Sequence, residues 1–247
     1  MCGRITCRTS GEEFQREFNL AFAEKVSPRY NLAPTQPVPA VVNAAGPRIL
    51  EHLKWGLIPK WAKDPKIGSR MINARAETLA EKPAFRHALE KRRCLVLADG
   101  FYEWKRDGKL RTPYHVQRAG GRPFAMAGLW EEWTSPTGEL VRSCTIVTTS
   151  PSELLAKLHD RMPLILAADE IDLWLSPAAL AKEHLDGLLR TSRVTDLELY
   201  PVSPKVNSVS FDGPELLERP KESAAPATAP AADLFAGSSL PGVAPRR

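Results

Sequence analysis

The stretch CLVLADGFYEW (residues 94–104) combines aliphatic and aromatic residues in the pattern of a buried β-strand. Other β-rich stretches lie on both sides of it: VPAVV (38–42), RILEHLKW (48–55), TPYHVQ (112–117), PFAMAGLW (123–130), SCTIVTT (143–149) and LELYPVS (197–203). Most of these strands follow one another as hairpins do, and helices are inserted between them irregularly. We therefore predict an α+β fold with a mostly antiparallel sheet, not a doubly wound parallel one.

Four helices are expected around these strands. Ser10 and Glu13 have capping-box spacing, which predicts a short helix directly after Ser10. Residues 150–153 (SPSE) predict the start of a second helix that ends near His159. The remaining two are expected over 171–175 and 178–189.

The bulk composition is that of a soluble globular protein, with 247 residues, 43% hydrophobic and 26% charged. We expect a single monomeric domain over residues 1–218, followed by a disordered Ala/Pro-rich tail over 219–247. The four cysteines are Cys2, Cys7, Cys94 and Cys144. They form no CxxC pair and no zinc-like cluster, so we expect no metal, no cofactor and no disulfide framework. No stretch resembles a signal peptide or a membrane span, which favours a cytoplasmic protein.

Positive charge is concentrated in residues 48–75, which hold seven lysines and arginines against two acidic residues, while the whole chain has a net charge of +5. The same segment contains Trp55 and Trp61. Cations with interleaved aromatics suit single-stranded nucleic acid, because cations bind phosphates and flat rings stack on bases. A solvated basic face with two core tryptophans is the alternative that composition leaves open.

Cys2 becomes the N-terminal residue when Met1 is removed. It then carries a thiol and an α-amine that both titrate close to neutral pH. Such an aminothiol reacts with an aldehyde through the amine first and then closes a five-membered thiazolidine with the thiol. An ordinary cysteine at a frayed terminus is the alternative.

Other polar residues occupy unusual positions, and each has a structural alternative. Glu103 ends an apolar strand and could carry out acid/base work or pair with a neighbouring cation. His159 could be catalytic or could cap a helix. Asn73 could act as a turn residue and Arg75 as a surface charge.

Seven short motifs resemble, in the same order, the signature segments of the SRAP family of abasic-site processing proteins. They are MCGRI, RYNLAP, WGLIPKW, NARAET, GFYEW, HDRMP and PVSPKVNSV, within residues 2–216. The resemblance implies a barrel-like, bifurcated β-sheet core with surrounding helices. It also implies that the mature Cys2 captures the aldehyde of an abasic site in single-stranded DNA as a thiazolidine, shielding the lesion during the response to DNA damage.

The same resemblance implies roles for individual residues. Cys2 is the expected nucleophile, and Asn73 is expected to hydrogen-bond at the reacting centre. Glu103 is expected to transfer protons near the Cys2 amine, also during reversal, and His159 to open the sugar ring. The expected DNA-contacting residues are Arg4, Pro39, Trp61, Arg75 and Arg161. Removal of Met1 by the protein itself and removal by an aminopeptidase both stay open as alternatives.

This chain departs from the family where Ser210-Phe211 follows the last motif, since a basic residue and Asn are common there. In the tail, Asp233, Leu234 and Phe235 resemble the end of pentapeptides that dock bacterial sliding clamps, although chance also explains this match. Two other functions remain open. A glutamine amidohydrolase with an N-terminal nucleophile also begins Met-Cys-Gly, and a non-catalytic single-strand binding module would use only the basic aromatic segment.

Overall fold

The computed structural model describes residues 2–43, 45–190 and 192–219. Met1 and the clamp-like Asp233, Leu234 and Phe235 lie outside the described residues, as does nearly all of the predicted tail. None of the helices in the described ranges has the length and apolar character needed to cross a membrane.

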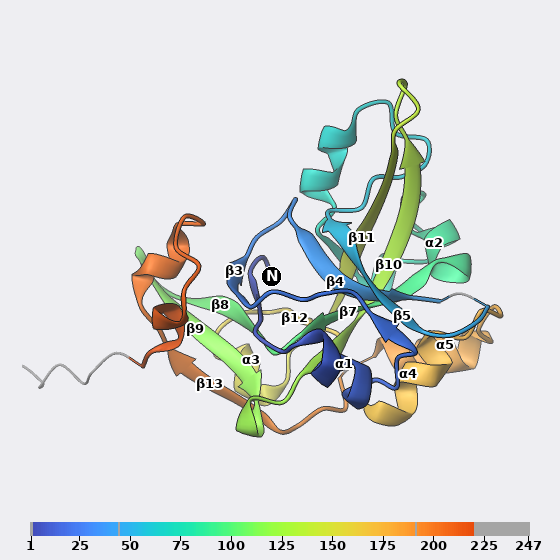
Figure 1. Ribbon diagram of the computed structural model, residues 1–247. Coiled ribbons are helices and arrows are strands. Elements are labelled where there is room, and N and C mark those ends of the chain that lie inside the picture. Colours follow the sequence, from blue (N-terminus) through green and yellow to red (C-terminus); the bar gives the residue numbers. More distant parts are fainter. Residues whose placement is uncertain (1, 44, 191, 220–247) are drawn as a thin grey trace, which may run out of the picture.

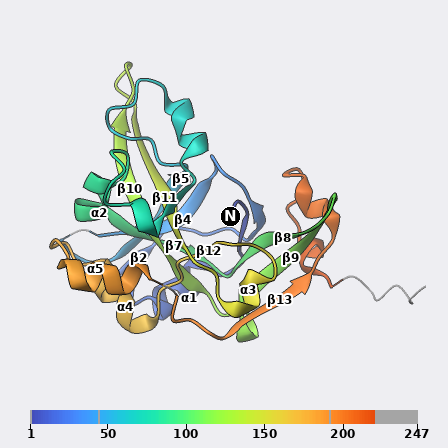
Figure 2. The same cartoon turned by 180° about the vertical axis from the view of Figure 1, so that it is seen from behind.

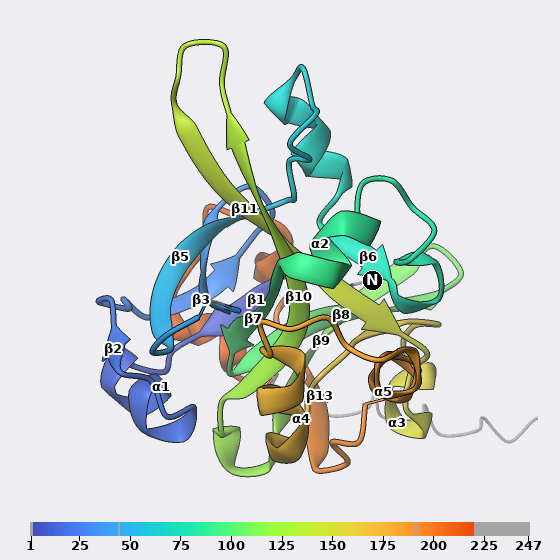
Figure 3. The ribbon, with the colours of Figure 1, turned by 90° about the vertical axis from the view of Figure 1, so that its right-hand side faces the viewer.

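Five strands form a closed ring, which is the larger part of the core (Figure 1, Figure 3). They are β4 (Pro37–Val42), β5 (Ile49–Trp55), β7 (Arg93–Ala98), β10 (Phe124–Thr134) and β11 (Leu140–Thr149). Four of the pairings in the ring are antiparallel, and the parallel pairing of β5 with β11 closes it. Three short strands extend this sheet: β2 (Phe22–Ala23), β6 (Asn73–Arg75) and β12 (Met162–Pro163). The predicted α+β class and barrel-like, mostly antiparallel core are confirmed.

A second, fully antiparallel sheet branches from the first. Its strand order is β13 (Leu197–Pro201), β9 (Leu110–Arg118), β8 (Gly100–Asp107), β1 (Ile5–Cys7) and β3 (Arg29–Leu32). The stretch 94–104 supplies one strand to each sheet, so its prediction as one continuous strand is wrong. The chain turns at Asp99, whose carboxylate accepts hydrogen bonds from the backbone amides of Arg8 and Thr9.

The two sheets share one apolar core, in which Phe101 of β8 meets Phe124 of β10 edge-on at 6.4 Å between ring centres. Cys2 belongs to this core. A smaller cluster lies on the other face of β8 and β9, where Tyr102 packs with Val206 and Leu216. Two 3₁₀ helices, η4 (Pro204–Asn207) and η5 (Pro214–Leu217), supply its outer residues.

The helices are short and lie at the periphery. Ser10 and Glu13 form the predicted capping box of α1 (Gly11–Glu17). The other helices are α2 (Arg86–Lys91), α3 (Glu153–Ala156), α4 (Ala168–Trp174) and α5 (Lys182–Leu189). Figure 2 shows α4 and α5 at the end of the molecule away from η4 and η5. Shorter 3₁₀ turns are η1 (Pro65–Arg70), η2 (Ala76–Thr78) and η3 (Ala119–Gly121).

Two helix predictions were too long. The helix expected over 178–189 begins only at Lys182, because the buried Arg93 guanidinium binds the carbonyls of Ser176 and Ala178 and holds that segment out of a helix. The helix expected to reach His159 ends at Ala156.

Candidate active site

Strand β1 positions the N-terminal residues between β3 and β8. Ile5 lies opposite Leu32 on one side and Phe101 on the other. The Tyr102 amide donates to the Arg4 carbonyl at 2.9 Å. The pairing continues towards the chain end, so Cys2 enters the core with its side chain fully buried.

Asn73 holds the backbone of Cys2 directly. Its Nδ2 donates a hydrogen bond to the Cys2 carbonyl oxygen at 2.7 Å. Asn73 reaches this position because β6 runs parallel to β11, with Asn73 opposite Ile146. The other end of the carboxamide, Oδ1, is buried and accepts no hydrogen bond from the described residues. An acceptor is therefore left beside the predicted nucleophile.

Glu103 is 5% exposed and lies close enough to Cys2 to change its ionisation. Burial, and after it the negative charge of Glu103, raise the pKa of the Cys2 thiol to about 12, although a hydrogen bond with the Arg4 amide acts in the opposite direction. The buried thiol is consequently neutral at pH 7. A proton must leave this sulfur before it reacts as a thiolate, so a nearby base is needed.

Arg4 is partly buried and already engaged within the protein. Its Nη1 donates to Asn31 Oδ1 at 2.6 Å and to the Val206 carbonyl at 2.7 Å. Burial lowers the pKa of its guanidinium. Arg4 thus ties the N-terminal strand to the chain's last described segment.

His159 and Arg161 lie on a separate segment that ends in β12. The Arg161 amide donates a hydrogen bond to His159 Nδ1 at 3.1 Å, and the same nitrogen lies 2.6 Å from Asp160 Oδ1, with which it pairs when it is protonated. The Arg161 guanidinium donates two hydrogen bonds to the Glu77 carboxylate, at 2.6 and 2.9 Å. This fork joins the His159 segment to the turn that follows Asn73, so Arg161 fixes the geometry of the site whether or not it also binds phosphate.

The remaining DNA-contact candidates separate into exposed and buried residues. Trp61 is 61% exposed, and Arg75 is also exposed. Trp55 is a core residue instead, with its indole Nε1 donating to the Ile72 carbonyl. Pro39 is buried in β4 opposite His52, so its prediction as a DNA contact finds no exposed surface to support it.

Sequence reasoning assigned no role to Asn31 or Glu77, although both lie in quoted motifs. Asn31 Nδ2 contacts three carbonyls, those of Val206, Ser208 and Phe211. The motifs RYNLAP and PVSPKVNSV therefore meet in space. Their order along the chain gave no sign of this contact.

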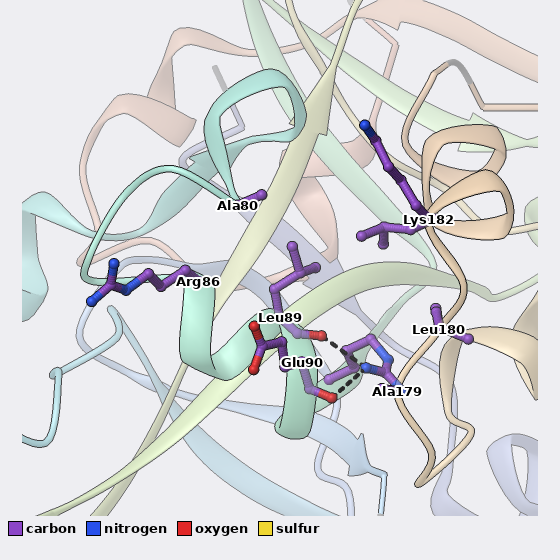
Figure 4. A pocket seen from close by; sticks show the side chains of 9 residues that line it. Ala80, Arg86, Leu89, Glu90, Ala179, Leu180 and Lys182 are labelled. Carbon is purple, nitrogen blue, oxygen red and sulfur yellow. Dashed lines mark hydrogen bonds between the residues drawn. The ribbon is translucent and has the colours of Figure 1, made fainter.

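A separate cavity of about 220 Å³ lies between α2 and α5 (Figure 4). Arg93 lines this cavity, but its guanidinium donors are already used in hydrogen bonds to the Leu89 and Glu90 carbonyls and to three further carbonyls. Its walls are aliphatic and charged and include none of the candidate residues. The chemistry of the site is therefore concentrated at Cys2 and not in this cavity.

Comparison with known proteins identifies relatives over most of the chain. The profile of the family "SOS response associated peptidase (SRAP)" matches residues 1–209. Abasic site processing protein YoqW of Bacillus subtilis is 45% identical over 222 residues, covering 88% of this chain and 99% of the relative. Abasic site processing protein HMCES of Gallus gallus is 31% identical over 263 residues, covering 88% and 77%. A crystal structure of a Bacteroides thetaiotaomicron protein superposes with a TM-score of 0.79 at 25% identity, covering 88% of this chain and 99% of that one.

Proposed function

Because the chain belongs to the SRAP family, we propose that it processes abasic sites in single-stranded DNA and captures them covalently through Cys2. Its relatives YoqW and HMCES are named abasic site processing proteins. The observation that carries the covalent step is the position of Cys2, which Asn73 holds by its carbonyl beside the carboxylate of Glu103. The DNA substrate places this activity at the nucleoid.

The chemistry starts from the open form of the abasic sugar, which carries an aldehyde at C1′. Removal of Met1 frees the Cys2 α-amine, which attacks C1′ and gives an imine with loss of one water. The Cys2 sulfur then adds to C1′ while its proton passes to the imine nitrogen. The product is a thiazolidine, and no oxidant or reductant is consumed.

The neighbouring residues supply hydrogen bonds and proton transfer. The acceptor Oδ1 of Asn73 is available to the amine or to a sugar hydroxyl. Glu103 is the proton carrier for a thiol whose burial keeps it neutral. His159 is the acid/base for opening the sugar ring, and the hydrogen bonds of Arg161 to Glu77 tie its segment to the turn after Asn73. The same groups release the DNA when the reaction runs in reverse. The imine is also the intermediate from which a lyase-like cleavage of the DNA strand would start.

Covalent capture is tested with labelled single-stranded DNA that contains one abasic site. We expect a heat-stable band of protein joined to DNA on a denaturing gel. Cys2→Ala removes the thiol and should abolish the band, and protein that retains Met1 should do the same because its amine is blocked. Equal crosslinking by Cys2→Ala would contradict the mechanism.

Two controls separate chemistry from binding. DNA with a tetrahydrofuran analogue has no aldehyde and should bind without crosslinking. Cys7→Ala removes a different buried cysteine and should leave the band in place. Intact mass of the protein before the assay establishes whether Met1 is absent.

A further inference from the structure

The segment 203–212 is held unusually firmly for an exposed loop. Asn31 Nδ2 binds the carbonyls at both of its ends, Val206 at 3.3 Å and Phe211 at 2.7 Å. Asp212 accepts from the Tyr30 amide at 2.6 Å and pairs with Arg29. The backbone on either side of residue 209 is therefore fixed before any ligand arrives.

This firm loop nonetheless presents apolar side chains to solvent. Val209 is 54% exposed and Phe211 is 43% exposed. The Lys205 Nζ lies 5.9 Å from the centre of the Phe211 ring. An aromatic face next to a lysine is the combination that binds single strands, because the ring stacks on a base and the cation neutralises a phosphate.

The loop is physically joined to the reactive end of the chain. Arg4, two residues from Cys2, donates to the Val206 carbonyl at 2.7 Å and to Asn31 at 2.6 Å. Figure 1 shows η4 and η5 in orange beside β3, while the cyan segment that contains η1 lies across the strands from them. Trp61, which precedes η1 in the sequence, is also exposed.

We propose that Phe211 stacks on a base next to the abasic site and that Lys205 contacts a neighbouring phosphate. This inference rests on the proposed function and adds a residue that binds the nucleotide next to the lesion. Ser210-Phe211 is also the point at which the sequence departs from the family pattern.

The test measures equilibrium binding by fluorescence anisotropy with single-stranded DNA that carries one tetrahydrofuran analogue. Phe211→Ala should weaken binding about 10-fold, within the range for the loss of one stacked base. Two further oligonucleotides lack the base directly 5′ or directly 3′ of the analogue. With one of them, Phe211→Ala and wild type should bind within about 2-fold of each other, because the stacking partner is gone.

The matched control is Phe22→Ala, which removes a phenylalanine of β2 that is 57% exposed and lies on a different part of the fold; it should not change affinity. Phe211→Trp should restore wild-type binding. Equal affinity of Phe211→Ala and wild type for the first oligonucleotide would overturn the proposal, as would a loss that persists with both base-deleted oligonucleotides. Since the analogue cannot crosslink, failure of the covalent mechanism leaves this measurement intact.

Discussion

At the scale of single residues, the burial of Cys2 opposes its reactivity, and a neighbouring group has to compensate. A cysteine whose thiol is held neutral by burial is a poor nucleophile on its own. Glu103 also disfavours the thiolate, so its carboxylate cannot activate the sulfur by charge attraction. Its useful property is the capacity to accept and return a proton at short range.

This role predicts the behaviour of Glu103→Gln. The amide keeps the shape of the side chain but cannot carry the proton needed to reopen the thiazolidine. Reversal of a purified crosslink should slow by at least about 10-fold. This factor is smaller than the rate enhancement that a general acid usually contributes. The measurement follows release of labelled DNA into an excess of unlabelled abasic DNA.

Glu132→Gln is the control for this experiment, since Glu132 is an exposed residue of β10. It should release DNA at the wild-type rate. If Glu103→Gln also did so, the proton would have to come from elsewhere, and His159 would be the next residue to substitute.

At the scale of elements, the turn between β7 and β8 sends the two halves of one apolar stretch into two different sheets. A side chain at Gly100 would put its Cβ 2.2 Å from His115 Nε2 and 2.6 Å from Thr6 Oγ1. His115 is fully buried, and burial lowers its pKa to about 3, so it stays neutral while bonded to Thr6 at 3.2 Å. Strands β1, β8 and β9 can meet there only around a glycine.

Gly100→Ala should therefore lower the free energy of unfolding by about 3 kcal/mol, as overpacking at a rigid site does. Urea unfolding followed by circular dichroism measures this change. Gly187→Ala is the matched control, because Gly187 lies inside α5 with nothing within 4 Å of a new Cβ. That variant should gain about 0.5 to 1 kcal/mol from helix propensity, and an equal loss in both would contradict the steric argument.

The sequence predicted the main elements because their signals are local. Stretches rich in β-branched, aliphatic and aromatic residues located the ring strands, and Ser10 with Glu13 located α1. The turn at Asp99 was missed although Asp99-Gly100 is a turn dipeptide, because the apolar residues on both sides have the pattern of one strand. Three-residue strands such as β6 also lack a pattern of their own and exist through their partner β11.

The candidate site was predictable to a similar extent. Ordered motifs identified Cys2, Asn73 and Glu103, and the structure brings these three together. The Arg161–Glu77 fork and the burial of Pro39 were not predictable, because both depend on which strands become neighbours.

At the scale of the whole molecule, unpaired positive charge gathers around Trp61. Lys60, Lys63 and Lys66 are exposed, and none of them pairs with a carboxylate in the described part of the chain. Each cation that neutralises a phosphate of a single strand steepens the salt dependence of binding by about 0.7. A strand that crosses this region should therefore bind more weakly as salt rises.

Replacing all three lysines by glutamine should reduce the slope of log affinity against log salt by up to about two. Anisotropy titrations over a range of salt concentrations give this slope. Lys91→Gln, in α2, should leave it unchanged. A triple variant with the wild-type slope would place the strand elsewhere on the surface.

The hydrogen bond from Arg4 to Val206 joins residues 202 positions apart, and β1 pairs with β8 about a hundred residues downstream. The ribosome adds about 5 to 20 residues per second, so the first residues wait roughly 5 to 20 seconds for β8 and roughly 10 to 40 seconds for Val206. Throughout that interval Cys2 has no core to enter. The N-terminus is therefore accessible to a methionine aminopeptidase during translation and before Cys2 is buried.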